Sequence, residues 1–560
     1  MIESAPRGTA GAVRDALETL SERFLVLYGD TFLDVDLREM WNTHANSGAS
    51  GTLLLHPNDH PEDSDLVEID ADGVIHSILA YPHPTGRDAR NLVNAALYIL
   101  ESEGLPEVIP TEGSTDMAKQ MFPAMLALGA HLHGYITPEY IKDMGTPARL
   151  DKVERDIIAG IPEKLSNRNL RQAVFLDRDG TLIREVNHLS SKDQIEILPE
   201  VTNAITSLNR NGILAVVVTN QPVVARGDIT IEELNQIHTR LETLLGAEGA
   251  YLNGLYFCPH HPDRGFPGEV LALKGPCLCR KPQTGLIDQA CRDLEIDRRQ
   301  SWLVGDSTSD IEAGRRAGLR TILLRTGHAG ADAKYPTRPD YICRDMQDAV
   351  HWISEGHVDL TRKMEPIAAA VGKGKRLVLI GGLARAGKSF AAQVLKELLY
   401  ALGYPAHVIS IDGWLKPKEQ RSESVGVSNR YDITTLSNLL TIVMASKSRE
   451  MLQEPVYDRI SGNSGHISIE HSIGPNDIII VEGVPALLMQ PLIDLPNSLR
   501  VYVDISQDIR SERLLRDYEW RGQNIETIVA TLAMRDLDET PIVVQSKSSA
   551  DFVIVKMEER

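Results

Sequence analysis

Short apolar segments rich in β-branched residues alternate with amphipathic stretches through most of the chain after residue 170. Examples are ILAVVVTN and SWLVGD in one region, and RLVLIGG and DIIIVEG in another. This alternation is typical of strands joined by crossover helices, which build parallel, doubly wound sheets. At 560 residues the chain is too long for one core. We therefore predict an α/β protein with several domains, each with its own sheet.

Changes in composition along the chain suggest three domains. The first covers residues 1–165 and ends after the charged helical stretch LDKVERDIIAGIPEKLSNRN. The second covers residues 170–332 and begins with the apolar strand AVFLD. Residues 333–371 contain the polar, proline-bearing segment ADAKYPTRPD and then a helical stretch, so we expect a linker there. The third domain covers residues 372–560.

Charge and cysteine content limit the partners and the compartment. The net charge of −20 argues against a nucleic-acid backbone or an anionic membrane as the main partner. We find no apolar run long enough to span a bilayer and no signal-peptide pattern at the N-terminus. The five cysteines are an odd number, and three of them lie between Cys258 and Cys279. This pattern favours a metal site in a reducing compartment, so we expect a cytoplasmic protein.

The segment AVFLDRDGTL predicts a buried strand that ends in two aspartates, Asp177 and Asp179. Ligands of open α/β sheets gather at the carboxyl ends of strands. One carboxylate there could attack phosphorus and the other could protonate the leaving oxygen. Strand-end aspartates also bind Mg²⁺. A strand capped by a polar turn would explain the two aspartates taken alone.

Four further polar residues follow later in this domain. Thr219 ends VVVTN, where its hydroxyl could hold phosphate. Lys281 in CRKP supplies a cation for phosphate charge, and Asp306 ends SWLVGD, followed by Asp310. This order of aspartate pair, threonine, lysine and late aspartate resembles the haloacid dehalogenase (HAD) superfamily, whose Rossmann-like fold we therefore expect here.

A cysteine- and histidine-rich pattern lies in the same domain. Its residues form C-x-H…C-x-C around a loop containing glycine and proline, and are Cys258, His260, Cys277 and Cys279. Thiolates and imidazole suit tetrahedral zinc, with the adjacent His261 as the alternative nitrogen ligand. A few buried cysteines are the alternative. Because the set leaves no evident open position, we expect a structural zinc.

The segments DRDGTL, NQPVVARG, CPHHP and CLCRKP are similar to the D-glycero-D-manno-heptose 1,7-bisphosphate phosphatases and to the related histidinol-phosphate phosphatases. The resemblance implies that Asp177 is the nucleophile, that Asp179 is the acid/base, and that Thr219 and Lys281 hold the phosphoryl group. It implies Mg²⁺ at Asp177, Asp179 and Asp306, and substrate contacts from Asn220, Arg226 and Arg280. Ser307 stands where the heptose enzymes usually carry lysine, which leaves the substrate assignment open.

The third domain opens with the strand RLVLIGG, the pattern G-x-x-x-x-G-K-S, and the helix FAAQVLKELLYALG. This context makes a P-loop, in which backbone N–H groups surround a phosphate chain. Lys388 would reach the terminal phosphates and Ser389 would bind Mg²⁺. The expected ATP-binding residues are Gly382, Ala386, Gly387, Lys388 and Ser389.

Later strands of this domain also end in carboxylates. Asp412 after VISID could accept a proton from a substrate hydroxyl, and Glu482 after DIIIVE could join the magnesium shell. A helical, basic segment then supplies Arg513, Arg516 and Arg521, which fit a lid over the phosphates or simply a solvated face. Together these features resemble the uridine kinase and phosphoribulokinase group, with Tyr457 and Asp458 in its acceptor loop. Gly462 stands where uridine kinases carry histidine, so the acceptor is left open.

The first domain contains LVLYGD, which ends at Asp30, and YIKDMGTPARL, which contains Asp143. Both segments, with PRGTAGAV, resemble sugar-phosphate nucleotidyltransferases, in which two such aspartates hold Mg²⁺. The G-x-G-T-R loop and the Glu-Lys-Pro motif of that family are missing. We therefore expect an incomplete domain, either degenerate and structural or truncated at the chain start, in preference to an active transferase.

These features predict a multidomain enzyme of sugar-phosphate metabolism. A magnesium-dependent phosphatase that hydrolyses a sugar bisphosphate, by resemblance a heptose bisphosphate, through a phospho-aspartate would be joined to an ATP-dependent small-molecule kinase. A phosphatase for histidinol phosphate or another phosphomonoester, fused to an unrelated kinase, is the first alternative. A binding or regulatory protein with inactive domains is the second. The sequence leaves the oligomeric state open.

Overall fold

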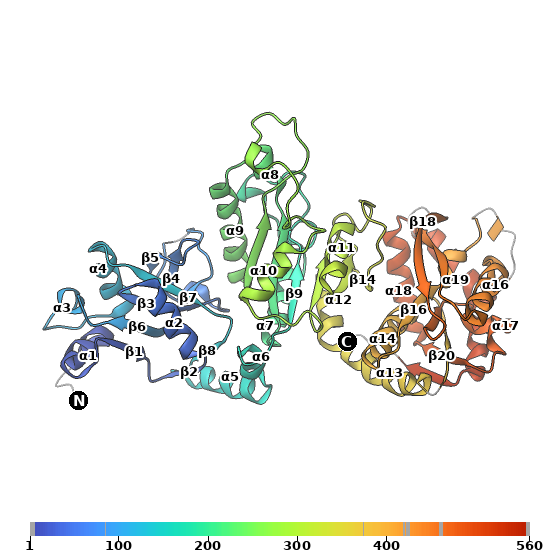
Figure 1. Ribbon diagram of the computed structural model, residues 1–560, viewed down its shortest axis with the longest axis horizontal. Helices are drawn as coiled ribbons and strands as arrows, with labels where there is room; N and C mark the ends of the chain where they lie inside the picture. The colour runs from blue at the N-terminus through green and yellow to red at the C-terminus, as the bar shows by residue number, and fades with distance from the viewer. Residues whose placement is uncertain are drawn as a thin grey trace. The chain divides into compact units, whose positions relative to one another are not determined.

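The structure is a computed structural model that describes residues 6–84, 86–372, 374–417, 420–421, 426–458 and 463–555. It divides into two compact units. The first contains residues 1–333 and 342–350, and the second contains residues 334–341 and 351–560. Both consist of helices packed on sheets (Figure 1). Within the described ranges, no helix is long and apolar enough to cross a membrane.

The N-terminal domain of the first unit is built on a mixed sheet. Its strand order is β5-β4-β6-β3-β7, with β1 paired to β6. A separate ribbon pairs β2 with β8 and sets Thr31 opposite Asp143. The strands are β1 (Arg23–Leu27), β2 (Thr31–Asp34), β3 (Gly51–His56), β4 (Leu66–Ile69), β5 (Ile75–Leu79), β6 (Val93–Glu101), β7 (Leu132–Ile136) and β8 (Tyr140–Asp143). The helices are α1 (Gly8–Ala16), α2 (Leu37–Ser47), α3 (Leu105–Val108), α4 (Phe122–Ala127), α5 (Pro147–Ile158) and α6 (Ile161–Leu165).

The central domain has a sheet in the order β11-β10-β9-β12-β13-β14, and the pairs among its first five strands are parallel. Its strands are β9 (Ala173–Leu176), β10 (Leu214–Asn220), β11 (Gly254–Cys258), β12 (Trp302–Gly305), β13 (Arg320–Leu324) and β14 (Tyr341–Cys343). Its helices are α7 (Val201–Arg210), α8 (Pro222–Arg226), α9 (Ile231–Gly246), α10 (Gly285–Asp293), α11 (Thr308–Ala317) and α12 (Met346–His351). Because β9, β10 and β12 are parallel neighbours, the residues that follow them meet at one edge of the sheet.

The second unit has a five-stranded parallel sheet in the order β16-β19-β15-β20-β21. The strands are β15 (Leu377–Gly381), β16 (Ala406–Ser410), β19 (Ile478–Glu482), β20 (Ser498–Asp504) and β21 (Phe552–Val555), with the hairpin β17 (Glu450–Asp458) and β18 (Asn463–Ile473) beside them. The helices are α13 (His357–Val371), α14 (Lys388–Ala401), α16 (Ile433–Ala445), α17 (Gln490–Ile493), α18 (Gln507–Trp520), α19 (Ile525–Asp538) and α20 (Thr540–Gln545).

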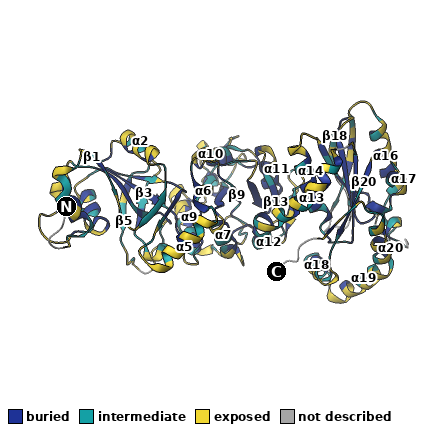
Figure 2. Ribbon diagram, turned by 90° about the horizontal axis from the view of Figure 1, so that it is seen from below, coloured by how far each residue is buried: buried dark blue, intermediate teal, exposed yellow. Residues whose placement is uncertain are grey.

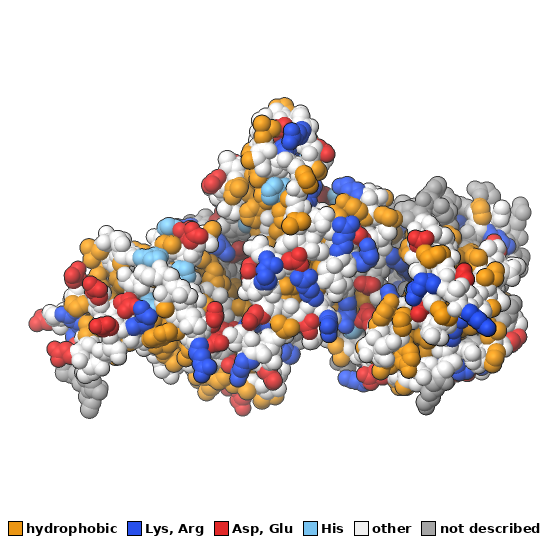
Figure 3. Space-filling view, viewed as in Figure 1, with side chains coloured by type: hydrophobic (Ala, Val, Ile, Leu, Met, Phe, Trp, Pro, Cys, Tyr) orange, Lys and Arg blue, Asp and Glu red, His pale blue; other side chains and the backbone are white. Residues whose placement is uncertain are grey.

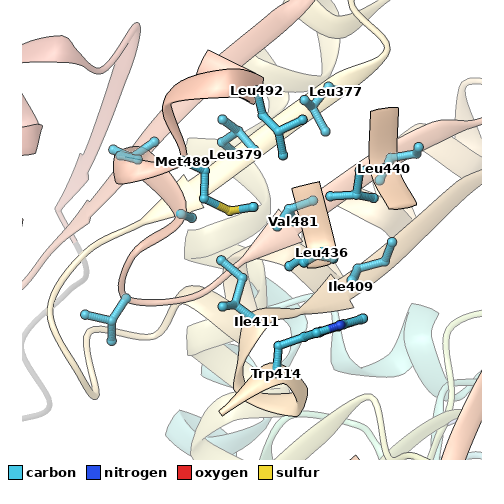
Figure 4. Close-up of a cluster of buried hydrophobic side chains, with 14 of the residues drawn as sticks. Leu377, Leu379, Ile409, Ile411, Trp414, Leu436, Leu440, Val481, Met489 and Leu492 are labelled. Atoms are coloured by element: carbon cyan, nitrogen blue, oxygen red, sulfur yellow. The ribbon is translucent and has the colours of Figure 1, made fainter. Parts of the chain in front are cut away.

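Each sheet is the centre of a hydrophobic core. Figure 2 shows the strands mainly buried and the outer helix faces exposed. In the second unit, Leu379 and Val481 from the sheet pack with Leu436 and Leu440 from α16 (Figure 4). Trp414 in the same cluster is also buried. Burying a large apolar side chain stabilises a fold by roughly 1.5–3 kcal/mol, so this cluster firmly anchors the turn after β16.

The prediction of an α/β protein with parallel sheets is confirmed for the central and C-terminal regions. The N-terminal sheet is α/β but mixed, because β3 pairs parallel with β7 and antiparallel with β6. Residues expected as part of a linker carry β14, α12 and α13 in the structure.

Candidate active sites

The strand-end carboxylates of the central domain converge on one buried lysine. Lys281 Nζ lies 2.7 Å from Asp177 Oδ1 and 2.6 Å from Asp310 Oδ1, and its side chain is only 2% exposed. Asp306 joins them, because ligand atoms of Asp177, Asp306 and Asp310 all lie within 4.8 Å of one another. Three carboxylates therefore face one lysine ammonium group at a site that is largely shielded from water.

This excess of negative charge shifts the pKa values of the groups that form the cluster. Burial, reinforced by Asp310 and Asp179 and opposed by Lys281, raises the pKa of Asp177 to about 7. Burial and the neighbouring Asp177 and Asp310 raise the pKa of Asp306 to about 8. Burial disfavours the charged form of Lys281, but the two carboxylates beside it outweigh this and raise its pKa. Mg²⁺ binds carboxylate oxygens. The three carboxylates here outnumber the positive charge beside them, so they fit that ion.

Local backbone geometry makes room for Asp306. Gly180 follows the aspartate pair with a φ of 76°, and a Cβ atom there would lie 2.3 Å from Asp306 Oδ2. Asp306 Oδ2 accepts the His328 N–H at 2.6 Å. The next residue, Ser307, caps α11, and its N–H donates to Asp310 Oδ2 at 3.0 Å. The cap thus explains how Asp310, one turn on, reaches the same centre.

Asp179 is held separately from this carboxylate cluster. The Arg178 guanidinium donates to both of its oxygens, at 3.0 and 3.2 Å, and Gln221 Nε2 donates to Oδ2 at 2.8 Å. Arg178 Nη1 also lies 3.2 Å from His238 Nε2. Burial and the charge of Arg178 depress the pKa of His238, which stays neutral and can accept that bond. The side chain of Asp179 is therefore oriented by three hydrogen bonds from two side chains, those of Arg178 and Gln221.

The other sequence-predicted residues lie around this centre. Thr219 is buried and accepts a hydrogen bond from Gln221 Nε2 at 2.9 Å. Asn220 brackets the backbone of Lys281, accepting its N–H at 2.9 Å and donating to its carbonyl at 3.1 Å. Arg226 ends α8, with its guanidinium carbon 4.4 Å from the Phe266 ring centroid. The end of this domain that carries α8 bears basic and hydrophobic side chains in Figure 3.

The cysteine and histidine side chains form a second cluster. Sγ of Cys279 lies 3.1 Å from that of Cys258 and 3.4 Å from that of Cys277, and 3.3 Å from His260 Nδ1. All four ligand atoms lie within 4.8 Å of one another, which fits one tetrahedral ion. His261 is not one of these four ligands. Its Nδ1 accepts the Asp263 N–H at 3.2 Å within its own loop. Arg280 donates to the His260 carbonyl at 3.1 Å, joining this cluster to the Lys281 segment.

The C-terminal domain places the glycine-rich loop between β15 and α14. Gly382 has a φ of 143°, and a Cβ atom there would lie 2.4 Å from the Val503 carbonyl oxygen. Gly387 has a φ of 98° and Ala386 is fully buried. Lys388 Nζ donates to the Leu383 carbonyl at 2.8 Å, and Ser389 Oγ donates to Glu482 Oε1 at 3.1 Å. The loop thus curls around its own lysine.

Charged groups surround that lysine. Burial lowers the pKa of Lys388, opposed by the nearby carboxylates of Glu482, Asp412 and Glu539. Asp412 lies in the turn after β16, where the Pro455 carbonyl oxygen packs so closely on Gly413 that a Cβ atom there would lie 1.9 Å from it. The acceptor-loop residues 459–462, with Gly462, and the side chain of Asp458 fall outside the described residues.

The three predicted arginines, two on α18 and Arg521 directly after it, have different partners. Arg513 donates to the Arg385 carbonyl of the glycine-rich loop at 3.4 Å. Arg521 forms an ion pair with Asp517 at 2.7 Å, and Asp517 also pairs with Arg385. Arg516 pairs with Glu512 on the same helix and is largely solvent-exposed. Helix α18 therefore contacts the glycine-rich loop through two of its turns.

Comparison with known proteins finds a family model that matches part of each region. A nucleotidyl transferase model matches residues 1–159, a HAD-hydrolase-like model matches residues 278–349, and a phosphoribulokinase / uridine kinase family model matches residues 378–560. The D-glycero-D-manno-heptose-1,7-bisphosphate 7-phosphatase of Thermosynechococcus vestitus is 37% identical over 188 residues, which are 33% of this chain and 95% of that protein. Through its central domain, the chain belongs to the heptose-1,7-bisphosphate phosphatase family.

A second curated relative and a solved structure also match the central region. The D-glycero-β-D-manno-heptose-1,7-bisphosphate 7-phosphatase of Haemophilus ducreyi is 36% identical over 186 residues, 33% of this chain and 99% of that protein. The solved D,D-heptose 1,7-bisphosphate phosphatase of B. bronchiseptica, complexed with magnesium and phosphate, is 29% identical and has a TM-score of 0.29, covering 32% of this chain and 97% of that chain. The resemblances stated from the sequence are confirmed, and the chain is an enzyme with phosphatase and kinase domains.

The N-terminal domain also brings its two predicted aspartates together. Both flank Gly145, where a Cβ atom would lie 3.0 Å from Asp143 Oδ1 and 3.2 Å from Asp30 Oδ2. Unlike those of the phosphatase domain, both aspartates are exposed. Asp143 pairs with Arg149 and accepts the Gly145 N–H at 2.5 Å.

Several residues of the phosphatase centre are not predicted from the sequence. Asp310 is expected there only as a neighbour of Asp306, and no role is expected for Arg178, Gln221 or His238. The i, i+3 spacing of a helix cap was the available signal for Asp310. Nothing in the spacing indicates that His238, on α9, meets Arg178 after β9.

Proposed function

We propose that the phosphatase domain removes one phosphate from a heptose bisphosphate, with Asp177 as nucleophile and Asp179 as acid/base. The observation that carries this proposal is the separation of the two aspartates. Asp177 faces Lys281 and two further carboxylates, whereas Asp179 is oriented by Arg178 and Gln221. One acid is thus placed to hold a cation and the phosphoryl group, and the other to exchange a proton.

In the proposed reaction, a carboxylate oxygen of Asp177 attacks phosphorus, and the bond to the sugar oxygen breaks. That oxygen leaves with a proton from Asp179. Asp179 then takes a proton from water, whose oxygen attacks the phospho-aspartate, releasing phosphate and restoring Asp177. Lys281 and Thr219 would hold the phosphoryl oxygens. Mg²⁺ bound by Asp177 and Asp306 would neutralise charge on those oxygens.

The cysteine cluster is proposed to hold a structural zinc. Four nitrogen and sulfur ligands with no open position suit folding more than chemistry. Such an ion would fix the loop that runs from Cys258 to Lys281 and so the position of the lysine. All five cysteines are free of disulfides, which supports a reducing compartment such as the cytoplasm.

We infer that the second unit is an ATP-dependent kinase for a small molecule. Its glycine-rich loop, Lys388 and the Ser389–Glu482 pair are arranged as phosphate and Mg²⁺ binding requires. Asp412 is the candidate to accept a proton from the acceptor hydroxyl.

A phosphate-release screen with Mg²⁺ tests the phosphatase proposal. The panel contains heptose 1,7-bisphosphates of both anomers, other sugar phosphates and histidinol phosphate. We expect fastest turnover for a heptose bisphosphate with one phosphate released per sugar. Faster turnover of histidinol phosphate would instead support the alternative of a different phosphomonoesterase fused to an unrelated kinase.

A further inference from the structure

A short segment between two strands of the phosphatase sheet belongs to the kinase unit. Residues 334–341, which run from the loop after β13 to the first residue of β14, fall within the second unit, whereas residues 342–350 belong to the first. The segment is tied to α14, the helix that follows the glycine-rich loop. Gln393 Nε2 donates to Asp340 Oδ1 at 2.7 Å, and the Tyr341 hydroxyl donates to Glu397 Oε1 at 2.6 Å.

Arg338 of this segment bridges two buried carboxylates of the kinase. Its Nη1 lies 3.1 Å from Glu454 Oε1, and its Nη2 lies 3.8 Å from Glu482 Oε1. The side chains of Glu454 and Glu482 are 3% and 5% exposed, while that of Arg338 is 37% exposed. The guanidinium can therefore leave toward solvent, but the carboxylates cannot.

Both carboxylates are connected to parts of the kinase centre. Glu482 accepts the Ser389 hydroxyl at 3.1 Å, the pair expected at the metal. Glu454 accepts the Ser410 N–H at 2.9 Å, directly before the turn that carries Asp412, and its other oxygen lies 2.6 Å from His471 Nε2. Buried carboxylates need a counter-charge, and Arg338 supplies one to Glu482 from outside.

We propose that Arg338 is part of the kinase metal site and competes with Mg²⁺ for Glu482. The inference rests on the proposed kinase function. A positive guanidinium 3.8 Å from a metal-binding carboxylate either repels the incoming cation or must be displaced by it. In both cases its removal tightens Mg²⁺ binding. The Mg²⁺ affinity of the kinase is thereby lowered by a residue that lies, in sequence, between two strands of the phosphatase sheet.

The sign of this effect separates the proposal from a purely structural role. A contact that only supports the fold would weaken Mg²⁺-dependent ATP binding when lost. A competing cation would strengthen it. Arg338→Lys loses the guanidinium fork but keeps the charge, so it should stay near the wild type in Mg²⁺ requirement, whereas Arg338→Met keeps the apolar stem and removes the charge.

Arg449 offers a matched control next to the same hairpin. It directly precedes β17, the strand that carries Glu454, and its Nη1 is 3.8 Å from Oδ2 of the largely buried Asp477. Asp477 precedes β19 and Glu482 ends it, so the two carboxylates are separated by five residues, roughly 16 Å along the strand. Arg449→Met thus removes an equivalent cation from a carboxylate outside the metal site.

The experiment titrates MgCl₂ at fixed ATP and measures ATP binding to the full-length protein by equilibrium dialysis, with thermal melting as a check of folding. In Arg338→Met the half-saturating Mg²⁺ concentration should fall about fivefold or more, as for coupling between neighbouring sites. Arg338→Lys and Arg449→Met should stay close to the wild type.

An unchanged or raised Mg²⁺ requirement in folded Arg338→Met overturns the inference while leaving the kinase proposal standing. If Arg338→Met does not fold, Arg338→Gln, which keeps a hydrogen-bond donor without the charge, decides by the same criterion. A wild-type protein that binds no ATP at any Mg²⁺ concentration rejects the kinase proposal and the inference with it.

Discussion

The first unit contains two pairs of strand-end aspartates that look alike in sequence and differ in structure. Asp177 and Asp306 follow parallel strands of the phosphatase sheet and meet the buried Lys281. Asp30 and Asp143 lie at the ends of a small ribbon and flank Gly145. The Asp143 side chain is 48% exposed, and its partner Arg149 is similarly exposed.

The difference shows what makes a carboxylate pair a site. In the phosphatase domain, burial raises the pKa values of Asp177 and Asp306, because three acids face one base. This electrostatic repulsion persists because the surrounding sheet fixes the positions of the charges. In the N-terminal domain, water and Arg149 satisfy the charge of Asp143 without any ligand. A carboxylate pair that needs a cation is therefore distinguished by burial and by convergence with other charges.

The largest expected effect is at the buried pair. Asp177→Asn keeps the shape of the side chain but removes the proposed nucleophile, so the proposed phospho-aspartate could not form. Phosphate release should fall on the order of 10³-fold or more. Turnover of the preferred phosphorylated sugar with Mg²⁺, measured on protein of unchanged melting temperature, tests this. Near-normal turnover would show that Asp177 is not the nucleophile.

The criterion of burial and convergence with other charges also applies to the kinase site. Lys388 is buried and faced by carboxylates, so Lys388→Ala should abolish Mg²⁺-dependent ATP binding because it removes the cation that faces the terminal phosphates. Phosphate release by the Asp177 site should stay within about twofold of the wild type, since the two sites lie on separate sheets.

The reciprocal measurement sharpens this result. Asp177→Asn should leave ATP binding unchanged. If either substitution altered the other site severalfold, the coupling free energy would be about 1–3 kcal/mol and the sites would not be independent.

A smaller effect is expected at the cysteine cluster. Protein purified without chelators should contain about one zinc per chain. Zinc removal, followed by restoration of Mg²⁺, should lower the melting temperature of the first unit before it abolishes turnover, because the ion fixes a loop. A loss of about 2 kcal/mol would lower it by roughly 4–8 °C. Elemental analysis without zinc, or turnover lost at an unchanged melting temperature, would contradict a structural ion.

The sequence predicted those features that local patterns encode. Strand–loop–helix patterns predicted the parallel sheets, the strand ends located Asp177, Thr219 and Asp306, and the CRKP segment located Lys281. Contacts between residues far apart in the sequence could not be predicted from these local patterns. Arg178 meets His238 across 60 residues, and Arg338 reaches Glu454 across 116 residues. Asn220 was expected to contact substrate, and the structure shows it bracketing the backbone of Lys281, which spacing alone does not indicate.

The smallest expected effect is at the exposed pair. Asp143→Asn should change neither phosphate release nor the melting temperature, because water and Arg149 already satisfy that carboxylate. A sharper form uses the Lys388→Ala background, in which the kinase site no longer binds ATP. Equilibrium dialysis with ATP, GTP, CTP, UTP and dTTP should then find no Mg²⁺-dependent binding, with or without Asp143→Asn. Binding that persists in Lys388→Ala and disappears on adding Asp143→Asn would make the N-terminal domain a working nucleotide site. Burial would then be the wrong criterion for the comparison, and convergence of two carboxylates at Gly145 would be enough.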